Sequence, residues 1–185
     1  SSYSLTFEDG TQLSRMLMRG EVEQAPDEVS MEMYRYMTEK LRSAGFVHYE
    51  ISNFALPGFE SRHNSSYWRG VPYVGLGPGA HSYDGRSCRR RDIPDLKKYL
   101  GSETAPFEEE FLSDDELFNE KVMTSLRTSE GLNLADLSEQ NRDYVLEISQ
   151  RHIEAGRMKI SGQMLCLTFD GIFISNDILS DFMKV

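Results

Sequence analysis

The chain contains 185 residues, 39% of them hydrophobic, and its 20 basic and 30 acidic side chains give a net charge of −10. This length and hydrophobic content are typical of one large or two small globular domains and exclude a disordered chain. The acidic balance argues against nucleic acid or an anionic membrane as partner, and no apolar run approaches the ~18 residues of a membrane span.

The cysteines and the first residues indicate the compartment. Cys88 and Cys166 lie far apart and in no C-x-x-C motif, so we expect reduced thiols in a cytoplasmic protein. Residues 1–10 contain no charged-then-apolar leader. The sequence enters directly as a predicted strand, and we therefore expect it to begin inside a larger fold.

The first fifty residues predict a strand, a helix and a second strand. Residues 2–7 alternate polar and apolar side chains. Pro26 opens a run of apolar residues at helical spacing that ends before Gly45, which suits the position after a helix. Residues 46–52 are rich in aromatic and β-branched side chains. This order predicts a parallel sheet.

The middle of the chain has weaker signals. Residues 53–70 are predicted to form a long loop, "VPYVG" at 71–75 a short strand, and "IPDLKKYL" at 93–100 a short helix. Residues 102–112 are predicted to be a linker. They would separate a first domain, residues 1–101, from a small helical domain at residues 113–185.

Residues 113–185 have the stronger helix signals. Ser113 and Glu116 form a capping-box pattern for a helix to about Arg127. A short helix in "NLADLSEQ" and a longer one closed by Gly156 follow. Two strands should flank Ser161-Gly162, and a last helix should be capped by Ser175 or Asn176. The order resembles a winged-helix module without a basic recognition helix, so we expect it to dock on the rest of the protein.

The segment "RHNSSYW" gathers side chains suited to a flat ligand. It offers an imidazole, an amide and two large aromatic surfaces. A porphyrin or another planar, metal-bearing molecule would use all of them. The alternative is that the two aromatic residues are half-buried core and the histidine bonds a backbone carbonyl. The candidates are His63, Asn64, Tyr67 and Trp68.

The segment "GLGPGAHS" places three glycines at the end of a predicted parallel strand, where α/β folds bind ligands. The spacing does not match G-x-G-x-x-G, so a dinucleotide site is not expected. The cofactor-binding candidates are Gly75, Gly77, Gly79, Ala80, His81 and Ser82.

An arginine cluster follows in this acidic chain. Arginine binds carboxylates in a bidentate manner, so the cluster suits the propionates of a porphyrin. The alternative is an exposed turn paired with Glu108, Glu109 and Glu110. The cluster contains Arg86, Arg89, Arg90 and Arg91, of which Arg90 and Arg91 are the propionate candidates.

The stretch "YEISNFALPGFESRHNSSYW", followed by "YVGLGPGAHS", resembles the radical-SAM family of oxygen-independent coproporphyrinogen III oxidase-like proteins, and within it the haem chaperone branch. Further matches are Leu126-Arg127, Gly131-Leu132 and "LTFDGIFISNDILSDFM". The resemblance extends over nearly the whole chain.

The resemblance implies a parent protein with a [4Fe–4S] cluster, S-adenosylmethionine and haem. Family members hold the cluster with a C-x-x-x-C-x-x-C motif, which this chain lacks, so we expect it to bind no cofactor alone. It would be a C-terminal portion: the end of an incomplete (β/α) barrel and a small winged-helix-like domain, of α/β class. The glycine segment would border the S-adenosylmethionine side, and His63 would contact haem.

Three functions follow from the resemblance. The first is a haem chaperone, whose expected partners are haem, the missing N-terminal portion, a haem-accepting protein and a membrane-associated partner. The second is the oxidase that decarboxylates coproporphyrinogen III to protoporphyrinogen IX. The third is a structural module that closes the barrel. The His-Asn-x-x-Tyr-Trp block favours the first.

Overall fold

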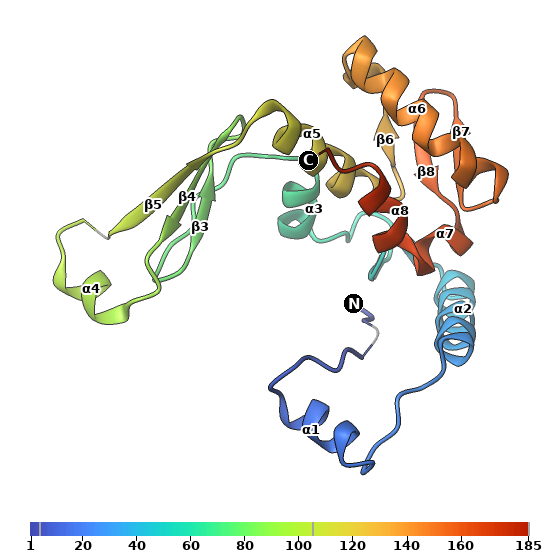
Figure 1. Cartoon of the computed structure of the whole chain (residues 1–185), viewed down its shortest axis with the longest axis horizontal. Coiled ribbons are helices and arrows are strands. Elements are labelled where there is room, and N and C mark those ends of the chain that lie inside the picture. The colour runs from blue at the N-terminus through green and yellow to red at the C-terminus, as the bar shows by residue number, and fades with distance from the viewer. Residues whose placement is uncertain (4, 105, 185) are drawn as a thin grey trace. The chain divides into compact units, whose positions relative to one another are not determined.

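The computed structural model describes residues 1–3, 5–104 and 106–184, which form two compact units, Ser1–Glu60 and Ser61–Val185. Both units combine helices and strands (Figure 1), so the α/β class predicted from the sequence is confirmed. In this described part, no helix is both long and apolar enough to cross a bilayer. The predicted domain boundaries at residues 101 and 113 stay predictions.

The first unit contains α1 (Gln12–Met18), α2 (Asp27–Ser43), β1 (Val47–Glu50) and β2 (Asn53–Ala55). Helix α2 begins after Pro26, and Gly45 follows its end with a positive φ of 85°, as predicted. The sequence analysis missed α1. Its signal is Thr11, whose side chain accepts a hydrogen bond from the Ser14 N–H.

Two predictions for this unit are wrong. The strand predicted at residues 46–52 contains β1, which pairs with β2 in an antiparallel hairpin and not in the predicted parallel sheet, because only residues 51–52 separate the two strands and a parallel crossover needs a dozen or more. Residues 2–7 form no strand over their described positions, while residue 4 lies outside the described residues. Tyr3 and Leu5 are largely exposed, so their alternation has no core to face.

A polar network fixes the β1–β2 hairpin. The Tyr34 hydroxyl of α2 donates to the Ile51 carbonyl at 2.6 Å and lies 2.9 Å from His48 Nε2. Burial raises the pKa of Tyr34 to about 12 and lowers that of His48. The carboxylate of Glu50, which is 2% exposed, accepts from the Asn53 amide at 2.5 Å. Buried polar groups with such partners hold the turn in one geometry.

The second unit begins with a helix and a three-stranded antiparallel sheet, β3–β4–β5. Helix α4 confirms the short helix predicted at residues 93–100. The elements are α3 (Arg62–Trp68), β3 (His81–Tyr83), β4 (Cys88–Asp92), α4 (Leu96–Gly101) and β5 (Phe107–Phe111).

Three predictions for this region are corrected. Residues 53–70 are not a loop, since they contain β2 and α3, and Ser61 caps α3. Residues 71–75 form only an isolated bridge, Tyr73 to Tyr83, because the glycines that follow interrupt the ladder. The expected linker contains β5, whose backbone pairs with β4; residue 105 lies outside the described residues.

The rest of the unit is helical around the small antiparallel sheet β6–β8–β7 (Figure 1). Its elements are α5 (Asp114–Leu126), β6 (Leu132–Asn133), the 3₁₀ helix η1 (Leu134–Asp136), α6 (Glu139–Glu154), β7 (Met158–Ser161), β8 (Met164–Leu167), α7 (Phe169–Phe173) and α8 (Ser175–Asp181).

Most predictions here are confirmed. The Ser113 capping box, the helix before Gly156 and the hairpin around Ser161-Gly162 are all present. The analysis missed α7, and the predicted cap of the last helix is wrong. Ile174 precedes α8 and no side chain caps it, because α7 leads almost directly into α8 and the turn between them replaces a separate cap. Residue 185 lies outside the described residues.

The core of the second unit lies between α5, α6, α8 and this sheet. Phe118, Val122 and Leu126 of α5 recur every four residues and form one buried face. The other fully buried apolar residues of the cluster include Leu132, Val145, Leu165, Ile178 and Phe182.

We expect Leu126→Ala to destabilise the protein by about 2–5 kcal/mol, since it removes a fully buried side chain and leaves a cavity. Met123→Ala on the same helix is the matched control, because Met123 is exposed and should cost less than about 1 kcal/mol. Urea unfolding of both variants measures the difference. Equal losses would contradict the placement of the core.

Candidate ligand groove

A groove of about 680 Å³ lies in the second unit between α3, residues 69–73, the β3–β4 turn and the polar face of α5. Small-molecule sites typically occupy roughly 300–1,000 Å³. The groove combines aromatic surfaces with charged side chains, so it can hold a flat ligand that carries polar groups.

Helix α3 brings part of the "RHNSSYW" segment to this groove. Tyr67 and Trp68 are among the lining residues. His63 is exposed one turn earlier, and its Nε2 lies 3.2 Å from the Tyr67 hydroxyl. Residues four apart on a helix face the same side, which explains this contact. His63 therefore lies beside the groove, next to a residue that lines it, while Asn64 contributes its backbone N–H to the Ser61 cap.

A series of aromatic rings runs from His63 into the groove. The His63 and Tyr67 rings are 4.9 Å apart at 83°, and the Tyr67 and Tyr73 rings are 4.7 Å apart at 79°. Tyr83 continues the series at 6.3 Å from Tyr73. Edge-to-face packing of this kind holds each ring in place. Burial raises the pKa of both Tyr73 and Tyr83, so their hydroxyls stay neutral donors.

Trp68 carries an unsatisfied donor. Its indole Nε1 is buried and bonds to no acceptor in the described part of the chain. The Arg127 guanidinium lies 5.2 Å from the ring centre, on the side of α5. Trp68 therefore offers its ring to a flat ligand in the groove, while its unpaired N–H is buried.

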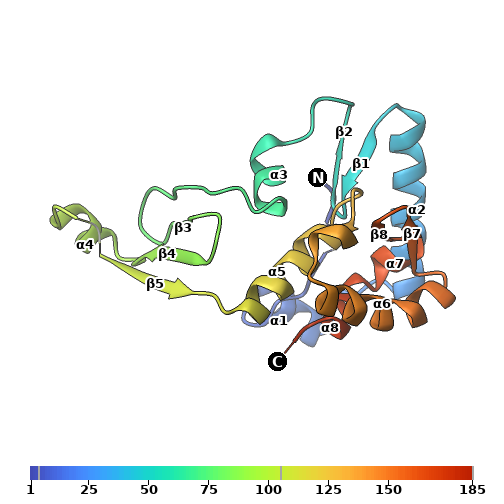
Figure 2. The same ribbon diagram turned by 90° about the horizontal axis from the view of Figure 1, so that it is seen from above.

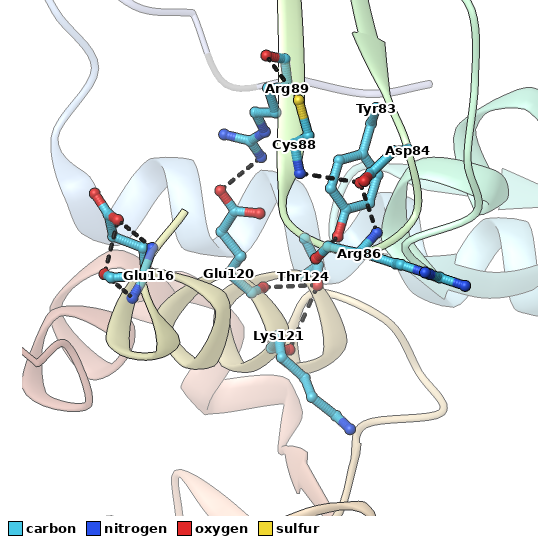
Figure 3. Close-up of polar contacts among 10 residues, drawn as sticks. Tyr83, Asp84, Arg86, Cys88, Arg89, Glu116, Glu120, Lys121 and Thr124 are labelled. Atoms are coloured by element: carbon cyan, nitrogen blue, oxygen red, sulfur yellow. Dashed lines mark hydrogen bonds and ion pairs between the residues drawn. The ribbon is translucent and has the colours of Figure 1, made fainter. Parts of the chain in front are cut away.

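An ion pair links the sheet to α5 beside the groove (Figure 3). Arg89 of β4 contacts the Glu120 carboxylate at 2.6 Å. Burial raises the pKa of Glu120, and the nearby guanidinium of Arg89 opposes that rise. The Thr124 hydroxyl donates to the Glu120 carbonyl one turn away. The pair therefore fixes where the β3–β4 turn lies relative to the helix.

The β3–β4 turn is held by Asp84. Its carboxylate accepts from the backbone N–H groups of Arg86, Ser87 and Cys88, which lowers the pKa of Asp84. The Tyr83 hydroxyl donates to the Arg86 carbonyl at 2.9 Å (Figure 3). Arg86, which is exposed, is thereby placed at the groove.

The arginine cluster divides between two places. Arg86 and Arg89 line the groove, whereas Arg90 and Arg91 are not among its lining residues. The Arg90 side chain contacts Asp92 at 3.1 Å and stacks 3.8 Å from the Phe107 ring. The strand register sets these arginines opposite glutamates, Arg89 to Glu110, Arg90 to Glu109 and Arg91 to Glu108, but they lie in a strand and not in the exposed turn of the alternative interpretation.

The glycine segment is a tight connection into β3. A Cβ atom at Gly75 would overlap the His81 backbone, so only glycine fits there. The Gly75 N–H donates to the Ser82 hydroxyl at 3.0 Å. Gly77 has a positive φ of 117°, which a side chain would strain. None of Gly75, Gly77, Gly79, Ala80, His81 and Ser82 lines the groove, so their cofactor role stays a prediction.

Several groove residues were not predicted from the sequence. Tyr73 begins the segment "YVGLGPGAHS" but was not a site candidate, Tyr83 lies in no motif, and their proximity depends on the strand pairing. Glu120 and Thr124 could have been found, because they lie on the face of α5 opposite its buried one. Helical periodicity applied to polar residues gives that face.

The described residues contain no group of three or more histidine, cysteine, aspartate or glutamate side chains that could hold a metal ion. Cys88 lies in β4 and Cys166 is buried in β8, and burial raises the pKa of both thiols. A cluster held by three thiolates does not fit two separated, protonated thiols.

Comparisons with known proteins agree on one group of relatives. The chain is 35% identical over 184 residues to the haem chaperone HemW of Mycobacterium tuberculosis, which covers 97% of this chain and 46% of that protein. It is 40% identical over 147 residues to HemW of Synechocystis, covering 77% and 36%. The chain thus spans about half the length of the curated relatives it matches. No family model matches it.

The structural comparison gives the fold. The chain matches coproporphyrinogen III oxidase (HemN) from Escherichia coli, described as a radical SAM enzyme, with a TM-score of 0.62. The match covers 87% of this chain and 42% of that one, at 16% sequence identity. At such identity the likeness shows a shared fold and carries no statement about activity.

We expect Arg89→Met to raise the pKa of Glu120 further, since it removes the cation that opposes the effect of burial. Carbon-detected NMR titration of the glutamate carboxyls measures this shift. Arg91→Met is the matched control, because Arg91 is exposed on the same strand and forms no contact with Glu120 in the described structure. An unchanged Glu120 pKa in Arg89→Met would contradict the ion pair.

Proposed function

Since the chain is homologous to the C-terminal part of the HemW haem chaperones, we propose that the protein to which it belongs binds haem and delivers it to another protein. The observation that carries this proposal is the meeting of His63, Tyr67 and Trp68 at an aromatic groove. Haem is the cargo in this function, so it must be held firmly enough to travel and loosely enough to leave.

His63 is the proposed iron ligand. Neutral imidazole is a common ligand of haem iron, and a second contact usually fixes the ring. The Tyr67 hydroxyl supplies that contact at Nε2, which leaves Nδ1 for the metal. Because His63 is exposed beside the groove, a haem bound there stays accessible to an acceptor protein.

The arginines would hold the propionates. Arg90 and Arg91 are the candidates from the sequence, and Arg86 and Arg89 lie at the groove. Arg89 already contacts Glu120, and Arg90 contacts Asp92, so each would have to leave its carboxylate partner to bind a propionate. Arg91 is exposed on β4 and needs no such exchange to reach a carboxylate.

The fold likeness to a radical SAM enzyme supports a finer architecture. Residues 1–101 would be the last part of an incomplete (β/α) barrel, with the glycine segment toward its S-adenosylmethionine side. Residues 113–185 would be a winged-helix-like domain that docks on it. The whole protein would carry the [4Fe–4S] cluster on residues other than Cys88 and Cys166.

The second candidate function is oxidative decarboxylation of coproporphyrinogen III. It rests on the likeness to the Escherichia coli oxidase, which shares the fold at low identity. A radical reaction would need a cluster, which both candidate functions place on residues other than Cys88 and Cys166, so the thiols of this chain do not separate the two. Haem binding that leaves the porphyrin chemically unchanged favours the chaperone.

We expect His63→Ala in the whole protein to shift the Soret band of bound haemin and to lower its affinity by about tenfold or more, since an axial ligand is lost. Trp68 is the single tryptophan of these 185 residues, and quenching of the tryptophan fluorescence gives an independent binding curve. His81→Ala is the matched control, because His81 is also exposed but lies away from the groove.

The possible outcomes of this experiment lead to different conclusions about the iron ligand. A Soret shift in His63→Ala and none in His81→Ala supports the assignment. A shift only in His81→Ala would move the iron ligand to the glycine segment. Unchanged spectra and affinity in both variants, with full fluorescence retained, would favour the purely structural role.

We expect Arg90→Ala or Arg91→Ala to weaken porphyrin binding by about 1–3 kcal/mol, the range for a lost charge-assisted hydrogen bond. Haemin and its dimethyl ester should differ in affinity for the unmodified protein and should differ less for the variants. Equal affinities of the unmodified protein for the two ligands would argue against propionate recognition.

A further inference from the structure

Strand β5 leaves one edge of the β3–β4–β5 sheet open. It pairs with β4 over five consecutive residue pairs without a bulge. In Figures 1 and 2, β4 lies between β3 and β5, so β5 is an outer strand. All five of its residues are exposed. A regular, uncovered edge of this length is a template for a further strand.

Hydrogen bonds at the two ends of β5 show which backbone groups face outward. The Leu112 N–H donates to the Ser87 carbonyl and the Ile93 N–H to the Pro106 carbonyl, both at 2.9 Å. Hydrogen-bonded pairs alternate along an antiparallel ladder, so residues 108 and 110 also bond to β4. The residues between them direct an N–H and a C=O away from β4. These outward groups belong to Phe107, Glu109 and Phe111.

The side chains of β5 are unusual for an edge that only needs to stay soluble. Phe107 and Phe111 project from the same face, and their exposed fractions are 41% and 71%. The Arg90 guanidinium stacks on the Phe107 ring and holds it in place. Charge alone would keep an edge soluble, whereas exposed rings at both ends of the strand offer contact area to a partner.

A second copy of the chain does not fit this edge. The sequence "FEEEF" reads the same in both directions, so antiparallel self-pairing would set Glu109 opposite Glu109 and Glu108 opposite Glu110. Like charges directly opposite each other destabilise a strand pair. The same three carboxylates attract a strand of opposite charge.

We propose that the free edge of β5 docks an extended segment of a partner protein in which three consecutive lysine or arginine residues are flanked by apolar residues. In antiparallel register each basic residue meets one of Glu108, Glu109 and Glu110, and each apolar residue meets one phenylalanine ring. The outward backbone groups supply affinity and the side chains supply selectivity. This surface is separate from the proposed haem groove, which no β5 residue lines.

The test uses the whole natural protein that contains this sequence and a fluorescent, end-blocked Val-Lys-Lys-Lys-Val peptide. Hydrogen exchange should show that the peptide slows the amides of Phe107, Glu109 and Phe111 by about tenfold or more, because these donors become bonded. The amides of residues 108 and 110 should already be slow without peptide, since they bond to β4.

Paired variants separate backbone pairing from charge. Glu109→Pro removes one outward donor at an edge position that tolerates proline, and should weaken peptide binding by about tenfold or more. Glu109→Gln removes only the charge and should weaken it by about threefold. Glu147→Gln, at an exposed site on α6, should leave binding unchanged.

Four results would overturn the proposal. One is the absence of binding. Another is binding without protection of the outward amides, which would be electrostatic adsorption only. A third is protection of those amides before peptide is added, which would mean that the protein covers its own edge. The last is protection that grows with protein concentration, which would identify a second copy as the occupant.

Discussion

Helix α5 contributes one face to the hydrophobic core and another to the groove, and the structure of the second unit depends on this double role. Phe118, Val122 and Leu126 bury one face of the helix in the core. The opposite face carries Glu120 and Thr124 to the groove. With 3.6 residues per turn, neither face can rotate without moving the other. The packing energy of the core thus holds the groove residues in position, and the Arg89 ion pair transmits that position to the sheet.

Local signals in the sequence were enough where one residue determines one feature. Ser113 and Glu116 specified the start of α5, and Gly156 the end of α6, because capping chemistry acts within a single turn. The β7–β8 hairpin followed from Ser161-Gly162 for the same reason. Each of these features can be derived from a few neighbouring residues.

Features that depend on distant partners were not predictable in this way. β1 and β2 form an antiparallel hairpin because only two residues separate them, whereas the order of the predicted elements had indicated a parallel sheet. The segment predicted as a linker contains β5, because its backbone can pair with β4. The groove likewise joins α3, the β3–β4 turn and α5, so Trp68 could be selected from its motif whereas Tyr83 could not.

The backbone of strand β4 pairs with β3 on one side and with β5 on the other, and this pairing limits how the sequence of the β3–β4 turn can change. Arg90 lies on one face of the sheet, and Arg89 and Arg91 lie on the other. Inserting or deleting one residue in the turn after Tyr83 would change the parity of the strand and exchange those faces. Arg89 would then turn away from α5. Related proteins that keep this ion pair can therefore change the length of the turn only by an even number of residues.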